Sequence, residues 1–187
     1  MIMTTSASLV FLNMPFVTLH LNINDKEYAS DGKHLIEFYI VTNKGESPKP
    51  LAKIASGGEL SRIMLALKAI LADRDQIETL IFDEIDTGIS GRTAQMVSEK
   101  MATIAGSRQL LCITHLPQIA SMADAHYLIE KSVQGQMTMT GIRRLKDTEQ
   151  IEELARMLGG VEITEKVLEN ARDMKNQAMA LKTKNCQ

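Results

Sequence analysis

Two adjacent carboxylates at the end of an apolar run are the first residues of this sequence that could do chemistry. Asp83 and Glu84 directly follow Thr79–Phe82, a short run typical of a strand buried on both faces. The carboxyl ends of parallel strands are where α/β folds bind ligands. Asp83 is therefore a candidate ligand for Mg²⁺, which takes few carboxylates, and Glu84 a candidate to orient or deprotonate a water. Acids where a strand simply ends in solvent would look the same.

A glycine-containing segment ahead of a long amphipathic pattern is the second candidate site. Ser56, Gly57, Gly58 and Glu59 come immediately before it. Glycines let the backbone approach an anion closely, and the N–H groups at a helix start favour negative charge. A serine N-cap followed by flexible glycines explains the same residues, and both interpretations stay open.

A histidine after a second apolar run is the third candidate. His115 follows the run Leu110–Thr114. At a strand end it could donate a hydrogen bond to a phosphate, although a lone histidine is more often a structural residue with satisfied hydrogen bonds.

The elements that must position these residues follow from hydrophobic periodicity. Apolar residues at helical spacing predict a helix from about residue 58 to residue 73 and another over 92–105. Strands are predicted at 79–82 and 110–114. Strand, helix and strand at this spacing predict a βαβ unit with a parallel pair, and hence an α/β fold.

Hairpins and helices are predicted on either side of this unit. Period-2 alternation and turn residues predict one hairpin from strands at 17–23 and 35–41, and a second from 127–130 and 137–142. Two further helices are predicted, one from Thr148 to the glycines at 159–160 and one from Thr164 to about Lys182.

Composition limits the class of protein. The 187 residues carry a net charge of −2, so an overall basic character does not argue for nucleic-acid binding. No apolar run reaches the roughly 18 residues needed to span a bilayer. Two cysteines cannot form a disulfide framework, which indicates a reduced, cytoplasmic setting. The one tight basic cluster, in 143–146, is interpreted as a solvated strand end.

In their order and spacing, the three candidate sites resemble the core of the ATP-binding cassette (ABC) ATPases. The segment 56–59 resembles the signature motif, 80–84 resembles Walker B, and His115 resembles the switch histidine. Glu59, where transporters usually carry Gln, points to the chromosome-maintenance and repair branch. Four segments closely resemble the bacterial RecN family of SMC-like proteins, which act in DNA double-strand-break repair; they are 51–62, 83–92, 114–118 and 155–160.

The resemblance implies a fold, a reaction and a set of partners. It implies an ABC-type head in which ATP, with Mg²⁺, is held between two copies, so that binding closes the heads and hydrolysis reopens them. It implies a cytoplasmic, nucleoid-associated protein that reaches DNA through its intact form, with no membrane contact. In the resemblance, Asp83 is implied to bind Mg²⁺, and Glu84 and His115 to act in catalysis. The implied signature motif, which acts on the ATP of the other copy, consists of Ser56, Gly57, Gly58 and Glu59. The implied D-loop consists of Gly88, Ile89 and Ser90. Ser90 stands where many ABC proteins carry Asp.

The sequence contains no G-x-x-x-x-G-K-[ST] phosphate loop, because its only Gly-Lys pair, Gly32-Lys33, lacks the other residues. We therefore expect residues 1–187 to form one domain, the C-terminal half of a head, with 1–15 as a poorly matched extension. The half that carries the loop is then an implied partner, and the chain alone is expected to be inactive. The alternatives are a non-catalytic module for dimerisation or for DNA or protein binding, and the head of another SMC-like or RecF-like ATPase.

Overall fold

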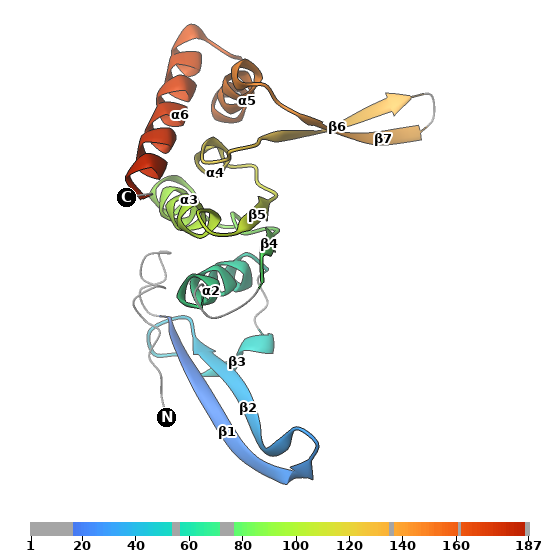
Figure 1. Ribbon diagram of the computed structural model, residues 1–187, viewed down its shortest axis with the longest axis vertical. Helices are drawn as coiled ribbons and strands as arrows, with labels where there is room; N and C mark the ends of the chain where they lie inside the picture. The colour runs from blue at the N-terminus through green and yellow to red at the C-terminus, as the bar shows by residue number, and fades with distance from the viewer. Residues whose placement is uncertain (1–16, 54–56, 72–76, 135–136, 161, 186–187) are drawn as a thin grey trace. The chain divides into compact units, whose positions relative to one another are not determined.

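Short sheets and helices alternate along the chain (Figure 1). The computed structural model describes residues 17–53, 57–71, 77–134, 137–160 and 162–185. These residues fall into two compact units. The first comprises the described residues up to Ile89 together with Arg108–Ile113, and the second comprises Ser90–Ser107 together with the described residues from Thr114 onward. The expectation of one domain over 1–187 stays a prediction.

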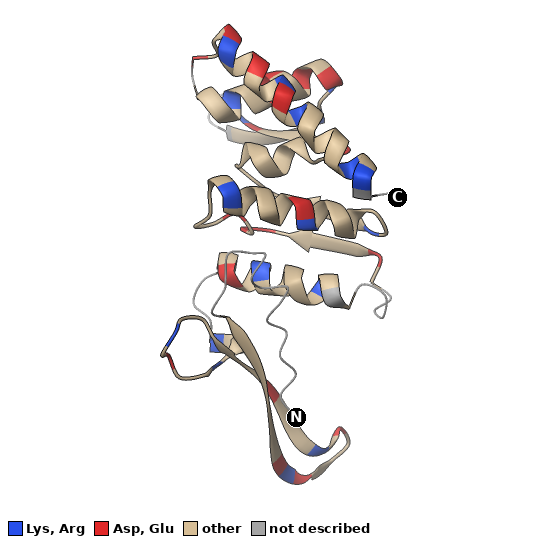
Figure 2. Ribbon diagram, turned by 90° about the vertical axis from the view of Figure 1, so that its left-hand side faces the viewer, with Lys and Arg blue, Asp and Glu red and all other residues tan. Residues whose placement is uncertain are grey.

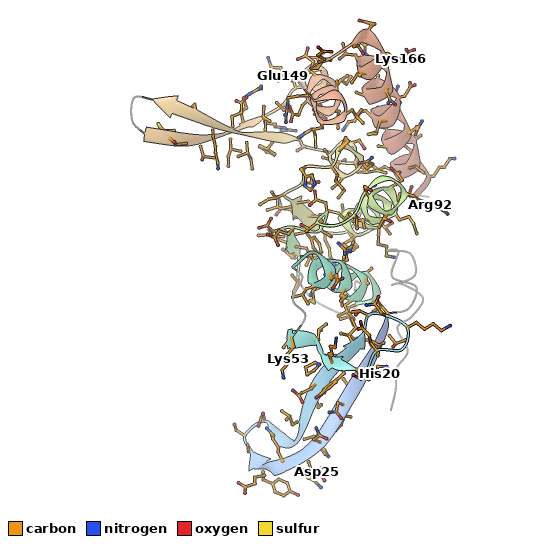
Figure 3. All side chains as sticks on the ribbon, turned by 180° about the vertical axis from the view of Figure 1, so that it is seen from behind. His20, Asp25, Lys53, Arg92, Glu149 and Lys166 are labelled. Carbon is orange, nitrogen blue, oxygen red and sulfur yellow. The ribbon has the colours of Figure 1, made fainter. Side chains whose placement is uncertain are left out.

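A long antiparallel hairpin opens the first unit. Strands β1 (Thr18–Ala29) and β2 (Gly32–Val41) pair as predicted, and both extend further into the turn. His20 lies on β1 well before Asp25, which is close to the turn (Figure 3). Leu19 and Ile40 are buried, whereas Ile23 is 46% exposed. The alternation therefore marks a buried face only at the end of the hairpin away from the turn. Strand β3 (Lys49–Pro50) adds to β2 and leads into the 3₁₀ helix η1 (Leu51–Lys53).

Helix α2 (Gly57–Ile70) is the predicted amphipathic helix. It buries Ile63, Leu65 and Ala66, whereas Leu60 and Met64, four residues apart, are 37% and 38% exposed. Arg62 shares this buried face and is only 7% exposed. A charged side chain on the apolar face of a helix was not anticipated from the periodicity.

A parallel pair of strands carries the candidate acids. Strands β4 (Thr79–Phe82) and β5 (Gln109–Cys112) pair from Thr79 with Gln109 to Phe82 with Cys112, which confirms the predicted parallel pair. The prediction that β4 is buried on both faces is wrong for this chain. Buried and exposed residues alternate along β4, with Phe82 6% exposed and Ile81 70% exposed, so one face of the strand is open in the described part of the chain.

Helices dominate the second unit. They are α3 (Gly91–Ala105), α4 (Pro117–Ser121), α5 (Asp147–Gly159) and α6 (Glu165–Asn185), with a hairpin of β6 (Tyr127–Gln134) and β7 (Met137–Arg144). Helices α3, α5 and α6 and the hairpin match predicted elements within a few residues. Leu154, Ala155, Ala171 and Ala120 form a core in which α4, α5 and α6 meet. Acidic and basic residues intersperse along α6, and its last turn is basic (Figure 2). None of the described helices is both long and apolar enough to cross a membrane.

Candidate active site

The turn after β4 presents the two candidate acids. Leu80 and Phe82 of β4 are buried, and the backbone N–H of Ile113 donates to Phe82 O at 3.0 Å. The strand therefore ends at a fixed point, from which Asp83 and Glu84 emerge exposed to solvent. A carboxylate oxygen of Asp83, Oδ1, accepts the backbone N–H of Glu84 at 2.9 Å. The first acid thus fixes the start of the turn that carries the second.

Glu84 has an unusual backbone conformation. Its φ angle is +56°, and it is the one non-glycine residue with positive φ in the described part of the chain. Residues with a Cβ rarely adopt this left-handed region, and such strain costs on the order of 1–3 kcal/mol and gathers at functional sites. The turn is closed by a hydrogen bond from Thr87 N to Glu84 O at 3.1 Å. The surrounding structure must therefore hold Glu84 in place.

The start of α2 lies directly against this turn. A Cβ added to Gly57 would lie 2.6 Å from Glu84 Oε2, and one added to Gly58 would lie 2.9 Å from the carbonyl oxygens of both Glu84 and Thr87. Only glycine permits this approach. The Glu84 carboxylate consequently lies near the first turn of α2, where N–H groups and the helix dipole favour negative charge. Sequence reasoning assigned these glycines to a nucleotide on another copy, whereas the structure shows that they also contact the candidate acid of their own chain.

Two polar side chains of α2 reach the same turn. Ser61 Oγ donates to Asp83 O at 3.0 Å, and Arg62 Nη1 donates to Thr87 O at 2.8 Å and Ile85 O at 3.3 Å. Burial lowers the pKa of Arg62, and Glu59 opposes the change. Sequence reasoning missed both side chains. The periodicity gave no signal for Arg62, because the buried face of α2 includes Leu65 and Ala66 while Leu60 and Met64 are 37% and 38% exposed.

Cys112 lies close to the acids at the end of β5. Burial first, and then the charges of Asp86 and Asp83, raise the pKa of the Cys112 thiol to about 12. The thiol therefore stays protonated at neutral pH and is a poor nucleophile. Asp86 is itself buried, at 3% exposure. The carboxylates of this turn thus set an acidic environment at the carboxyl end of the parallel pair.

The remaining candidate residues are divided between the units. Gly88, with φ of +74°, and Ile89 are the last residues of the first unit before the chain enters the second. Ser90 begins the second as the N-cap residue of α3, where its carbonyl accepts Thr93 N at 3.2 Å. His115 also belongs to the second unit, between Thr114, whose Oγ1 accepts Leu116 N at 3.0 Å, and α4. That His115 and Ser90 act together with Glu84 stays a prediction, and Ser56 lies outside the described residues.

The donor set at the turn suits a hard cation. Within the described ranges no three His, Cys, Asp or Glu side chains gather as a metal cage. Mg²⁺ commonly binds through one or two carboxylates and substrate phosphates while keeping several waters. The exposed carboxylate of Asp83, next to Glu84, fits that mode.

The basic cluster near the end of β7 is partly neutralised. Arg143 donates to Glu149 Oε1 at 2.7 Å and lies 3.7 Å from Glu130. The Lys146 backbone N–H and Arg143 together lower the pKa of Glu149, which is labelled on α5 in Figure 3. These pairs agree with the interpretation of the cluster as a solvated strand end.

Comparison with known proteins confirms the resemblance found in the sequence. The chain is 50% identical over 157 residues to the DNA repair protein RecN of Halalkalibacterium halodurans, and 45% identical over 157 residues to that of Bacillus subtilis. The chain is RecN-like. Each match covers 84% of this chain but only 28% and 27% of the relatives, and it falls on a C-terminal part of RecN. No family model matches the chain.

The fold is that of an SMC head. A crystal structure of the Smc head domain from Pyrococcus yayanosii aligns with a TM-score of 0.57 at 20% identity, over 81% of this chain and 28% of that one. This agreement confirms the predicted α/β, ABC-type head class. The RecN-like chain therefore has the elements of an SMC-type head with the candidate acids at the end of β4.

Proposed function

We propose that this chain is the part of a RecN-type ATPase head that supplies the water-activating acid, and that the whole protein uses ATP to close and reopen pairs of heads during DNA double-strand-break repair. The observation that carries the proposal is the turn after β4. There Asp83 and Glu84 stand exposed, at a strained and closely supported position, against the start of α2. The relatives with similar sequences are named DNA repair proteins.

Each candidate residue takes one role in the reaction. Glu84 accepts a proton from the attacking water, or orients that water, as it attacks the γ-phosphate in line. Asp83 would hold Mg²⁺, which when bound neutralises charge developing on the phosphates. His115 would donate a hydrogen bond to the γ-phosphate. The signature residues 56–59 would meet the nucleotide of the second head, with N–H groups directed at the phosphate, and the D-loop residues 88–90 would line the same interface.

The proposal requires a further segment that bears a phosphate loop. An exposed apolar strip on the parallel pair of strands is evidence for such a segment. Its residues Ile81, Leu111 and Ile113 are 70%, 48% and 53% exposed. Ile81 pairs with Leu111 across the strands, so the three lie on one face. Parallel sheets are normally covered on both faces. We propose that the rest of the head covers this face, and that the chain by itself does not hydrolyse ATP.

The test is Glu84→Gln in a full-length RecN-type protein that carries this sequence. The substitution keeps the shape of the side chain but removes the base. We expect kcat to fall by about 10²–10⁴-fold, ATP affinity to stay within about twofold, and closed head pairs to accumulate in light scattering. Glu78→Gln is the matched control, since Glu78 precedes the same strand at its opposite end. An unchanged kcat in Glu84→Gln would place the base elsewhere.

A further inference from the structure

We propose that Ser61 and Arg62 are positioning residues for Glu84. They form a clamp, defined here as the three hydrogen bonds from these side chains to the turn after β4. The inference rests on the proposed role of Glu84 in hydrolysis. It assigns a task to two side chains of α2 that bond to the backbone of this turn and have no role in the reaction proposed above.

The clamp holds alternate carbonyls on both sides of Glu84. Ser61 Oγ donates to Asp83 O at 3.0 Å, one residue before the acid. Arg62 Nη1 donates to Ile85 O at 3.3 Å and Thr87 O at 2.8 Å, one and three residues after it. Two adjacent residues of one helix therefore fix the backbone on both sides of the acid, which limits where its carboxylate can point.

The energetics show that the clamp is more than incidental packing. Arg62 is 7% exposed, and its Nε has no hydrogen-bond partner among the described residues. Removing a guanidinium from water is costly unless its hydrogen bonds compensate, and an apolar side chain would suit this face of α2 better. What Arg62 supplies, and an apolar residue cannot, is a donor to two carbonyls at once. Those carbonyls belong to a turn whose left-handed residue, with φ of +56°, is the proposed base.

The clamp also links two proposed parts of the reaction. Gly57 and Gly58 begin α2, and Ser61 and Arg62 follow on its next turn. The two glycines lie against Glu84 and Thr87, and the clamp holds Thr87 O together with the carbonyls on either side of Glu84. The start of α2 and the turn that carries the acid are thus one packed structure. Loosening the clamp should misplace the carboxylate without changing the groups that bind nucleotide.

The experiment compares four variants of the full-length protein. Arg62→Met removes the donors while keeping length and apolar volume, Arg62→Lys keeps one charged donor, and Ser61→Ala removes the third bond. Arg172→Met, at an exposed position on α6, is the matched control. We expect Arg62→Met to lower kcat about tenfold or more with KM for ATP changed less than twofold, because misplacement of a reacting group affects the chemical step. Arg62→Lys should recover part of the loss, Ser61→Ala should lose about twofold to threefold, and Arg172→Met should match the wild type.

Amide exchange of the peptide covering 83–90, without nucleotide, is the second readout. It should be at least about tenfold faster in Arg62→Met, because the amides of Thr87 and Ile89 are bonded within the clamped turn. Unchanged kcat together with unchanged exchange would overturn the inference. If Arg62→Met does not fold, the other two variants decide: intermediate losses of kcat support the clamp, and wild-type rates refute it. If the protein does not hydrolyse ATP, or Glu84→Gln keeps its rate, the proposed function fails, while exchange in 83–90 still tests the clamp.

Discussion

In each of the two units, a buried or half-buried cationic side chain donates hydrogen bonds to backbone carbonyls. The two cases differ in the conformation of the backbone that carries those carbonyls. Arg62 donates to Ile85 O and Thr87 O in the turn that carries Glu84. Lys175, on α6, donates to Ser121 O at 3.1 Å and Ala123 O at 2.9 Å. The second pair of carbonyls lies at the end of α4, where the last carbonyls of any helix lack partners within it.

The backbone conformation is a favoured one at the end of α4 and a disfavoured one in the turn after β4. The end of α4 is ordinary, with Met122 at φ −78°, and a cation there completes a conformation that the chain already favours. The turn after β4 contains a non-glycine residue in a left-handed conformation, and Arg62 maintains what the chain disfavours. The comparison teaches that the same type of bond serves stability in one unit and the geometry of a reacting group in the other.

Among the substitutions that test this comparison, the largest effect is expected from filling the glycine contact of the first unit. In Gly58→Ala the new Cβ would lie 2.9 Å from two backbone oxygens that cannot rotate away. Overpacking of this kind costs about 1–3 kcal/mol. We expect ATP hydrolysis to fall at least tenfold and amide exchange to accelerate in peptides covering 57–70 and 83–90 of the full-length protein.

Gly159→Ala is the matched substitution in the second unit. Its Cβ would lie 3.0 Å from Val167 Cγ1, a side-chain atom that can move. Alanine also favours helix by roughly 1 kcal/mol over glycine, so the change should be nearly neutral for stability and activity. Equal effects of the two substitutions would contradict the comparison.

The sequence predicted the elements better than the contacts between them. Helix α2 follows from helical spacing of apolar residues, strand β4 from a short continuous apolar run and the hairpin of β6 and β7 from its turn residues, all of which are local signals. Parallel pairing of β4 with β5 followed because a helix separates them in the chain. The candidate acids were found because a strand end is visible as a change from apolar to charged residues.

What could not be predicted depends on residues distant in sequence. The contact of Gly57 with Glu84 joins residues 27 positions apart, and a local pattern shows only that glycine is present. Arg62 was not marked by the periodicity, and its acceptors are backbone carbonyls, which every residue has. The exposure of Ile81 was missed because an apolar strand does not reveal whether its cover lies in the same chain.

A smaller effect is expected when the cation of the second unit is removed. Lys175→Met deletes both hydrogen bonds that this ammonium donates at the end of α4, while the bond from Lys182 to Met122 O remains, and a buried carbonyl left without a partner costs about 1–3 kcal/mol. Amide exchange in a peptide covering 117–124 should therefore accelerate, whereas kcat should stay within about twofold of the wild type. A loss of kcat as large as that of Arg62→Met, with binding unchanged, would show that the two cations do not differ in the way proposed.

The smallest effect concerns a histidine beside the same cation. Burial lowers the pKa of His126, the charge of Lys175 lowers it further, and Glu153 opposes both. Its Nδ1 is buried without a hydrogen-bond partner among the described residues. Because the folded pKa lies below the unfolded value of about 6.5, the unfolded chain binds more protons when the pH falls through this range. The second unit should therefore lose stability on acidification from about pH 7 toward pH 5.

His126→Gln provides the measurement, because glutamine keeps a polar side chain that does not titrate in this range. Exchange-derived opening free energies for peptides covering 147–159 should fall less steeply between pH 7 and pH 5 in the variant than in the wild type, after correction for the intrinsic pH dependence of exchange. Acid-induced changes at carboxylates are common to both proteins, so the difference between them isolates the histidine. Peptides covering 57–70, which lie in the first unit, should show the same pH dependence in both proteins. If the two slopes at 147–159 were equal, protonation of His126 would be compatible with the folded state, and its burial would have no consequence for stability.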